Sequence, residues 1–573
     1  MTYGEFGEEL SNVASGLRNM GFAPKTPIGI YASNCREWLV AEHACHAQNM
    51  TTVPLYDTLG PDVLEFIGRQ ADLAAIVCTA DKLAAAVHAS SLCPSVRAVI
   101  QMEPWSAGQR RPTSVPPGVE VVTLAELAAS GKRNPVAHTA PLPGDIFTIC
   151  YTSGTTGDPK GAVLTYANVV ANSAALRLAV PQVCKDDVHI SYLPLPHMFE
   201  RTIQVLIYSV GASIGFYGGE VLELFGDIEL LRPTIFVSVP RLFNRLYDKI
   251  NAAIQEGGPI KTFLFNRAFA AKQAALKDGH LTHALWDRLV FNKIKAKLGG
   301  RVHLMITGSA PISGSVLDFL RVCFSCQVLE GYGQTEASAA VTVTAMQTFS
   351  SGHVGAPVPS CEVKLVDVPE MNYTSQDTPC PRGEVCVRGP SVFSGYFKLP
   401  EQTAEALDAD GWLHSGDIGM WTEEGFLKII DRKKNIFKLA QGEYVAPEKI
   451  ENVYQRSPFV LQSFVHGDSL QPSLVGIVVP DPDVLQAWAK TNLPELANDL
   501  RALCAHEKTI NAVHEDMVAH GKDAKLRAFE QVRRIHLAAE PFSVEQGILT
   551  PTFKLKRPQA RALFAQVIND MYA

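Results

Sequence analysis

The sequence predicts an α/β fold: a large N-terminal body of parallel-type sheets with helices plus a small β region, followed by a smaller, mobile α+β C-terminal domain. Short apolar runs alternate with helical patterns as far as about residue 338. Short strands with turns come next, and a second set of strands and helices starts near Asp431. Because a chain of 573 residues normally divides into domains, we expect domains at 1–430 and 431–573, with a hinge near 431–434.

The first part of the chain alternates between the two kinds of element. Apolar residues recur at helical spacing from Phe6 to Leu17, and a strand is expected at 27–32 with a helix after it. The strand–helix order repeats over 51–70, and 74–80 is another short apolar strand. This alternation predicts parallel strands covered by helices. The Pro-, Ser- and Arg-rich stretch 103–143 is expected to be a loop-rich connection.

The alternation resumes at Asp145, and 260–298 has a helical pattern rich in lysine and alanine. Short strands of a meander or barrel are predicted next, at 361–368, 383–389 and 425–432. Strands of the C-terminal domain are predicted at 459–467 and 473–480.

Composition excludes several classes of protein. Lys and Arg number 51 against 58 Asp and Glu, and no long basic block occurs, so nucleic acid is not expected as the main partner. The 12 scattered cysteines, with no secretory leader before them, indicate reduced cytosolic thiols. Cys323 and Cys326 form one C-x-x-C pair, which we expect in a buried strand, since zinc needs more ligands.

No apolar stretch reaches the roughly 18 residues that a membrane span requires. Peripheral contact with a membrane surface is left open.

Residues 151–161 read YTSGTTGDPKG and directly follow an apolar strand. Glycines allow backbone N–H groups to approach an anion, hydroxyl groups add donors, and a lysine adds positive charge. An ordinary Gly/Thr turn is the alternative, but eleven such residues in sequence favour a polyphosphate site. The loop is not a Walker A motif, because proline precedes the lysine and glycine follows it. The predicted phosphate-binding residues are Thr152, Ser153, Gly154, Thr155, Thr156, Gly157 and Lys160.

This loop resembles the phosphate-loop signature of the adenylate-forming superfamily, which includes acyl-CoA synthetases, luciferases and nonribosomal adenylation domains. Further motifs follow in the family's order: SYLPLPHMFER (191–201), LEGYGQTEAS (329–338), DGWLHSGDIGMWTEEGFLKIIDRKK (410–434) and LTPTFKLKR (549–557). The 25-residue block is similar to the fatty acyl-CoA synthetase signature. The resemblance therefore implies a long-chain fatty acyl-CoA synthetase, which converts a fatty acid, ATP and coenzyme A to acyl-CoA, AMP and diphosphate through an acyl-adenylate.

The resemblance also implies roles for the residues of the nucleotide site. Thr335 would contact the α-phosphate, and Glu336 would hold Mg²⁺ together with Thr155, since a carboxylate beside a polyphosphate requires a cation between them. The adenine would lie against two segments, which contain Gly308, Ser309, Gly331 and Tyr332.

Four more positions match the family's motifs. Asp417 would accept both ribose hydroxyls, because a carboxylate offers two acceptor oxygens. Arg432 would contact ribose or phosphate, although a solvated arginine in a charged turn is the alternative. Lys554 would be the catalytic lysine, with Lys556 as its nearest rival. Gly442 would let the backbone pass close to the pantetheine of coenzyme A.

His197 is expected beside the acyl pocket, with a structural loop histidine as the alternative. Three rival functions remain at this stage: a fatty acyl-AMP ligase that stops at the adenylate, a luciferase-type enzyme, and a non-catalytic lipid-binding relative. The expected partners are a long-chain fatty acid, ATP and coenzyme A, with no obligate protein partner.

Two expectations concern the chain's start and its location. Met1 falls at the first helix, where long-chain relatives usually carry a preceding segment, so we expect this chain to lack the usual N-terminal extension. We expect the protein in the cytoplasm, or peripherally on the cytosolic face of a membrane such as that of the endoplasmic reticulum or another organelle.

Overall fold

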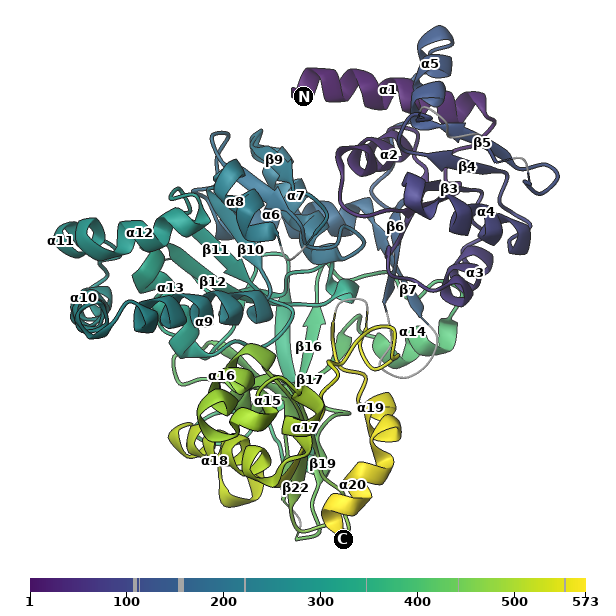
Figure 1. Ribbon diagram of the computed structural model, residues 1–573. Coiled ribbons are helices and arrows are strands. Elements are labelled where there is room, and N and C mark those ends of the chain that lie inside the picture. The colour runs from purple at the N-terminus through teal and green to yellow at the C-terminus, as the bar shows by residue number, and fades with distance from the viewer. Residues whose placement is uncertain are drawn as a thin grey trace.

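The computed structural model describes residues 1–106, 111–112, 114–152, 159–220, 223–346, 348–441, 443–550 and 553–573. These residues build two seven-stranded sheets, a four-stranded sheet and a C-terminal three-stranded sheet, together with one two-stranded ribbon. In Figure 1 the two large sheets lie side by side, with the C-terminal part of the chain below them. The fold thus has the predicted body and a C-terminal α+β part.

The first sheet has the strand order β5-β4-β3-β1-β2-β6-β7, and only the β6–β7 pair is antiparallel. One apolar cluster lies between the sheet and α1, α2 and α5, and a second lies between the sheet and α3 and α4. Helices therefore cover both faces, as expected for parallel strands. The elements are α1 (Tyr3–Asn19), β1 (Pro27–Tyr31), α2 (Arg36–Ala47), β2 (Thr51–Leu55), α3 (Pro61–Gln70), β3 (Ala75–Cys78), α4 (Leu83–Leu92), β4 (Ala98–Gln101), β5 (Glu120–Thr123), α5 (Leu124–Arg133), β6 (Ile146–Thr152) and β7 (Lys160–Thr165).

The expectation of a loop-rich connection over 103–143 is wrong in part, because this stretch contains β5 and α5. Thr123 and Glu126 form a capping box, in which the threonine hydroxyl accepts from the Glu126 N–H at 3.2 Å. The helix also packs tightly on α1, since a Cβ placed on Gly131 would lie 1.8 Å from the Asn12 carbonyl oxygen. The capping box at the start of α5 and the packing of α5 on α1 thus outweigh the polar composition of the residues around them.

The second sheet has the order β14-β13-β12-β11-β10-β8-β9, with parallel pairing from β9 to β12 and antiparallel pairing at β13 and β14. Its elements are α6 (Tyr166–Ala179), β8 (Val188–Ser191), α7 (Met198–Val210), β9 (Ser213–Phe216), α8 (Leu224–Leu231), β10 (Ile235–Ser238), α9 (Pro240–Glu256), α10 (Pro259–Lys277), α11 (Ala284–Trp286), a π-helical turn (Asp287–Phe291), α12 (Asn292–Lys295), β11 (Leu304–Thr307), α13 (Gly314–Phe324), β12 (Gln327–Tyr332), β13 (Thr342–Val343) and β14 (Ala356–Pro357).

The placement of the C-x-x-C pair in a strand is also wrong. Cys323 lies in α13 and Cys326 lies just before β12, although both side chains are buried as expected. Between them, Ser325 adopts a φ of 51° and ends the helix. A short apolar run does not distinguish a buried helix end from a buried strand by periodicity alone.

The small β region and the C-terminal part complete the chain. The region's four strands are antiparallel, and the strands expected at 361–368, 383–389 and 425–432 are present. In the C-terminal part, β21 and β22 occupy the stretches expected to be strands, and two further apolar clusters form its core. The elements are β15 (Glu362–Val366), β16 (Arg382–Arg388), α14 (Pro400–Ala406), β17 (Leu413–Trp421), β18 (Leu427–Arg432), β19 (Phe437–Lys438), β20 (Tyr444–Val445), α15 (Pro447–Tyr454), β21 (Val460–His466), β22 (Leu474–Pro480), α16 (Pro482–Asn492), α17 (Leu500–Ala505), α18 (Glu507–Asp523), β23 (Val532–Leu537), α19 (Arg557–Leu563) and α20 (Ala565–Tyr572).

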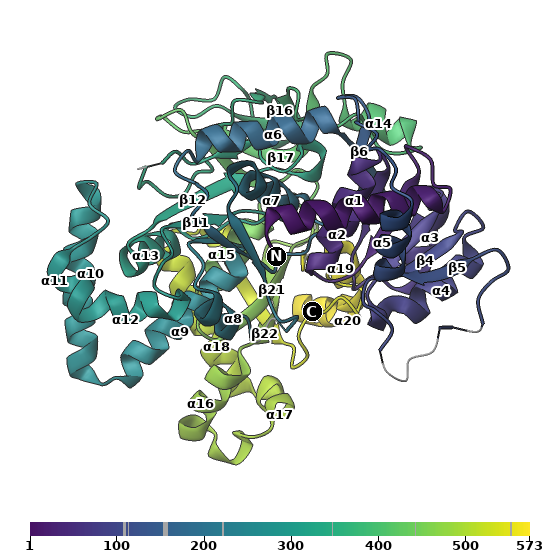
Figure 2. The same cartoon turned by 90° about the horizontal axis from the view of Figure 1, so that it is seen from above.

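Seen from above, the chain's two large sheets flank a central region into which the C-terminal part reaches (Figure 2). Among the described residues, no helix combines the length and apolar character that crossing a membrane would require.

Candidate active site

A pocket lies where α6 and α7 meet the carboxyl ends of β11 and β12. Its apolar wall includes Leu176 of α6, Val180 directly after α6, and Ile203 and Leu206 of α7. The opposite wall is formed by the loops that the sequence assigned to a nucleotide. The structure therefore brings the following predicted residues to one cavity: His197, Gly308, Ser309, Gly331, Tyr332 and Thr335.

The two glycines of this wall are required by close packing. A Cβ on Gly308 would lie 3.1 Å from the Gly331 carbonyl oxygen, and a Cβ on Gly331 would lie 3.3 Å from the Thr342 carbonyl oxygen. Ser309 follows with a φ of 72°, a conformation in which side-chain-bearing residues are uncommon. The backbones of these segments therefore pack directly against one another, with little room for a side chain between them.

Tyr332 and Asp417 meet at the edge of the pocket. The Tyr332 hydroxyl donates to Asp417 Oδ2 at 2.7 Å, and Arg432 Nε lies 3.7 Å from Asp417 Oδ1. Asp417 and Arg432 are paired residues of β17 and β18, so the sheet register sets their separation. Burial raises the pKa of Asp417, and the Arg432 charge opposes this effect. Three predicted nucleotide contacts thus form one connected group.

Lys554 approaches the same group from the C-terminal part of the chain. Desolvation, reinforced by the Arg432 charge, lowers the pKa of Lys554 to about 8, while Asp417 and Glu336 act in the opposite direction. Its loop is anchored three residues later, where Arg557 Nη2 lies 2.5 Å from Glu451 Oε2 in α15. The Lys554 ammonium is therefore within electrostatic reach of Asp417, Arg432 and Glu336 of the predicted nucleotide site.

Glu336 lies in a short 3₁₀ turn and is held by a residue that the sequence reasoning missed. The Tyr396 hydroxyl donates to Glu336 Oε1 at 2.7 Å, and the Lys160 ammonium lies 5.2 Å from the centre of the Tyr396 ring. The backbone around Tyr396 also bonds to the segments of Glu336 and Lys160. The Phe393 N–H donates to the Glu336 carbonyl, and the Phe397 N–H donates to the carbonyl of Gly161, next to Lys160. A Gly-Tyr pair after a strand was the only local signal for this role.

The phosphate loop is only partly described. Thr152 ends β6 and Lys160 begins β7, and the Thr152 hydroxyl donates to the Lys160 carbonyl at 3.3 Å. The remaining predicted residues lie outside the described residues, so their roles stay predictions: Ser153, Gly154, Thr155, Thr156, Gly157 and Gly442.

Within the described part of the chain, no group of three or more His, Cys, Asp or Glu side chains is placed to hold a metal ion. Mg²⁺ is commonly held by one or two carboxylates together with substrate phosphates. The carboxylate of Glu336, at the edge of the pocket beside Thr335, fits this mode of binding.

The predicted hinge contains a carboxylate that bonds to the adjacent backbone and to the start of α15. Asp431 Oδ1 accepts from the Arg432 N–H at 2.6 Å, and Oδ2 accepts from the Glu448 N–H at 3.0 Å at the start of α15. Lys434 was not assigned a role from the sequence. Burial, together with the charges of Arg432 and Lys160, lowers the pKa of Lys434. Lys434 is therefore within electrostatic reach of these two cations of the predicted nucleotide site.

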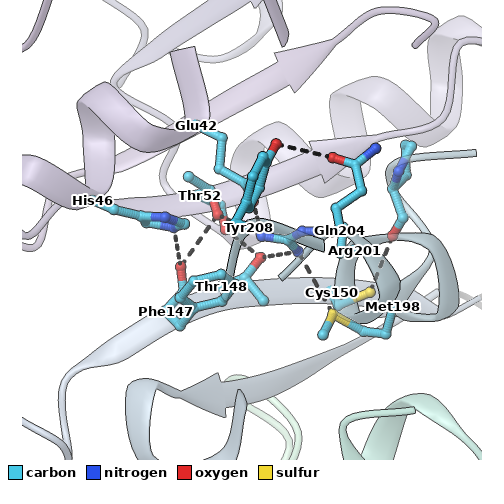
Figure 3. Close-up of polar contacts among 11 residues, drawn as sticks. Glu42, His46, Thr52, Phe147, Thr148, Cys150, Met198, Arg201, Gln204 and Tyr208 are labelled. Atoms are coloured by element: carbon cyan, nitrogen blue, oxygen red, sulfur yellow. Dashed lines mark hydrogen bonds and ion pairs between the residues drawn. The ribbon is translucent and has the colours of Figure 1, made fainter. Parts of the chain in front are cut away.

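A buried polar network behind the pocket fixes α7. Figure 3 shows the Arg201 guanidinium between Glu42 and Thr148: it pairs with the carboxylate and donates to the threonine hydroxyl at 3.0 Å. These contacts join α7 to α2 and β6 of the first sheet. His197 caps the same helix by accepting from the Phe199 N–H at 3.1 Å, and burial lowers its pKa to about 3, so the ring is neutral.

Comparisons with known proteins identify the family of the chain. The model of the AMP-binding enzyme family matches residues 1–397. The chain therefore belongs to the AMP-binding enzyme family. It is 51% identical to the peroxisomal long chain acyl-CoA synthetase 6 of Arabidopsis thaliana over 573 residues, which are 100% of this chain and 81% of that protein. It is 46% identical to the long-chain-fatty-acid–CoA ligase 6 of Homo sapiens, covering 100% of this chain and 82% of that protein.

The fold has a solved counterpart. The A domain of the carboxylic acid reductase from Segniliparus rugosus, solved with AMP and a co-purified carboxylic acid, matches with a TM-score of 0.83 and 26% identity. The match covers 100% of this chain and 87% of that chain. The predicted α/β adenylate-forming fold is thereby confirmed.

Proposed function

We propose that this protein is an AMP-forming long-chain-fatty-acid–CoA ligase. It activates a long-chain fatty acid with ATP to an acyl-adenylate and diphosphate, and then transfers the acyl group to coenzyme A with release of AMP. The observation that carries the proposal is the pocket in which an apolar wall from α6 and α7 meets the Tyr332–Asp417 pair, with Lys554 directed at the same place.

In the first half-reaction the fatty carboxylate attacks the α-phosphorus, and diphosphate leaves. Two anions must meet, so the ammonium of Lys554 stabilises the charge that develops at the reacting centre. Asp417 accepts the ribose hydroxyls, and Thr335 donates to the α-phosphate. Glu336, with Thr155 and the phosphate oxygens, would hold Mg²⁺, which neutralises phosphate charge when bound.

The acyl chain lies against the apolar wall. Leu176, Val180, Ile203 and Leu206 remove its methylene groups from water. His197 stands where this wall meets the nucleotide side, and its neutral ring adds no charge next to the fatty carboxylate.

In the second half-reaction, residues 431–573 act as a mobile domain that turns about 431–434 relative to the body of residues 1–430. Rotation withdraws Lys554 and opens a path for coenzyme A past Gly442, so that the thiolate displaces AMP. The separate apolar cores of the C-terminal part support this division.

The proposed place of action is the cytoplasm or the cytosolic face of a membrane, of the endoplasmic reticulum or another organelle. The absence of a membrane-crossing helix among the described residues is compatible with either.

The test measures coenzyme A-dependent release of AMP from ATP and palmitate by the wild type, Lys554→Ala and the control Lys556→Ala. We expect palmitoyl-CoA from the wild type and the control, and adenylation slowed at least about a hundredfold in Lys554→Ala. Acyl-adenylate without thioester would identify a fatty acyl-AMP ligase instead, and no adenylation by a folded wild type would contradict the proposal.

A further inference from the structure

Five large apolar side chains are exposed in one short part of the chain, between α9 and β11. In α10, Ile260 is 81% exposed, Phe263 67% and Leu264 40%. In the turns that follow, Leu285 is 56% exposed and Leu289 is 52% exposed. Exposed apolar residues are usual singly, but a group of this kind marks a surface that contacts something else.

The exposed residues of α10 lie on a face of their own. Phe265, Ala268, Lys272 and Leu276 are buried at spacings of three and four residues, so they form the inner face of the helix. Ile260, Phe263 and Arg267 follow the same spacing on the opposite side of the helix. Such a helix is apolar on both sides, which is characteristic of a helix covered on both sides.

The segment forms a hairpin that extends from the second sheet. The Lys272 ammonium lies 2.7 Å from Asp287 Oδ1, and the rings of Phe265 and Phe291 are 6.0 Å apart, so α10 runs antiparallel to the α11–α12 segment. In Figures 1 and 2 these helices stand at the outer end of the molecule, far from the first sheet. The outer surface of this hairpin is available to a large flat partner.

The hairpin is strongly basic in an acidic protein. Residues 258–301 contain nine Lys and Arg and two Asp, a net charge of +7, whereas the whole chain has a formal net charge of −7. Six of these cations are exposed and make no ion pair with any residue that the structure describes: Lys261, Arg267, Lys277, Arg288, Lys293 and Arg301. Elsewhere the chain is net negative, so an anionic surface is attracted to this end and repelled by the remainder.

We propose that the outer surface of the hairpin, formed by α10 and the α11–α12 segment, is a docking site for an anionic lipid bilayer. Apolar side chains at the level of the acyl chains, flanked by lysine and arginine at the level of the headgroups, are the chemistry of an interfacial helix. A second copy of the chain fits this surface poorly, because a symmetric contact would bring two segments of charge +7 together.

Docking here goes beyond the proposed reaction, since it states where the enzyme meets its substrate. A long-chain fatty acid partitions from water into a bilayer. An enzyme held at the bilayer surface therefore samples a higher local concentration of its acyl substrate than one free in solution.

The experiment measures flotation of the purified full chain with vesicles of phosphatidylcholine alone and of phosphatidylcholine mixed with phosphatidylserine. Two double variants probe the surface, Ile260→Ser with Phe263→Ser, and Lys261→Glu with Arg267→Glu. Each has a control at exposed positions elsewhere: Leu470→Ser, whose side chain is 84% exposed, and Lys132→Glu with Arg133→Glu on α5.

We expect the wild type and both controls to bind the anionic vesicles, with weaker binding at higher salt. Each double variant should lower the vesicle partition coefficient about tenfold or more. The proposal is overturned if the wild type does not bind anionic vesicles, or if the hairpin variants bind like their controls. It is also overturned if vesicle binding is absent and the same variants instead abolish a dimer of the chain. The same holds if they abolish binding of an acidic protein to this surface.

All substitutions lie on exposed side chains, and circular dichroism checks that each variant is folded. If a double variant does not fold, the single variants Phe263→Ser and Arg267→Glu replace it, with an expected loss of at least about threefold each. Unchanged binding of both folded single variants would equally overturn the proposal.

Discussion

The Tyr396 hydroxyl donates a hydrogen bond to Glu336 Oε1 at 2.7 Å, while the face of the same ring lies 5.2 Å from the Lys160 ammonium. One side chain from the small β region thus contacts an anion and a cation that the sequence assigned to the phosphates of ATP. The two contacts are separable, because the hydrogen bond needs the hydroxyl and the cation–π contact needs only the ring.

Tyr396→Phe is therefore expected to raise the Mg²⁺ concentration for half-maximal adenylation about tenfold, since a hydrogen bond to a charged group stabilises its position. The measurement is diphosphate release against Mg²⁺ concentration. Tyr396→Leu should in addition raise the KM for ATP. The control is Tyr31→Phe, which removes a hydroxyl bonded at 3.2 Å to the Leu59 carbonyl in the first sheet. An unchanged Mg²⁺ dependence in Tyr396→Phe would contradict the positioning role.

The lowered pKa of Lys554 predicts a pH dependence for the first half-reaction. A lysine with a pKa of about 8 is protonated below that pH and neutral above it. Because the ammonium form stabilises the charge that develops at the α-phosphorus, adenylation should fall as pH rises through about 8. Lys554→Arg keeps its charge in this range, so its residual rate should show no such fall. Stopped-flow adenylation across this range checks the prediction, and an identical profile for both proteins would refute it.

The Tyr332–Asp417 hydrogen bond predicts different effects for two conservative changes. Asp417→Asn keeps the shape but loses the charge that accepts ribose hydroxyls, and we expect the KM for ATP to rise about tenfold or more. Tyr332→Phe loses only the bond that holds Asp417, so its KM should rise less. Steady-state diphosphate release against ATP concentration measures both KM values. A larger loss in Tyr332→Phe than in Asp417→Asn would show that Asp417 is not the principal contact.

Arg201 predicts a large effect on stability. Its guanidinium is paired with Glu42 in the buried junction of the two sheets (Figure 3), and Arg201→Met leaves that carboxylate without its cation. Breaking such a pair costs about 3–5 kcal/mol of unfolding free energy, measured by urea denaturation. The control Arg36→Met removes a partly exposed ion pair with Glu37 and should cost less than about 1 kcal/mol. Equal losses would show that the buried Arg201 pair stabilises the fold no more than the partly exposed Arg36 pair does.

Much of the site could be predicted because its residues belong to contiguous motifs. Gly331, Tyr332, Thr335 and Glu336 lie within six residues of sequence, and the structure places the first three in the pocket wall with Glu336 next to them. Tyr396 could not be assigned in this way. Its role depends on contacts with Glu336 and Lys160, which are far away in the chain, and no local pattern encodes those contacts.

The errors in the fold have the same origin. The strand predicted for Cys323 is the end of α13, and the loop predicted at 103–143 contains β5 and α5. The elements concerned are short, so the surfaces on which they pack and, for α5, its capping box decide their structure more than periodicity does. The two large sheets were predictable because many strands repeat one pattern.

The sequence by itself determined the family, the order of strands and helices, and the identity of most groups expected to bind the nucleotide, because these depend on local spacing and on the chemistry of single residues. Only the tertiary structure decided that Tyr396 links Glu336 to Lys160, that Arg201 joins the two sheets behind His197, and that the outer face of α10 is left uncovered. These features are contacts, or missing contacts, between distant segments, and they exist only once packing has brought the segments together.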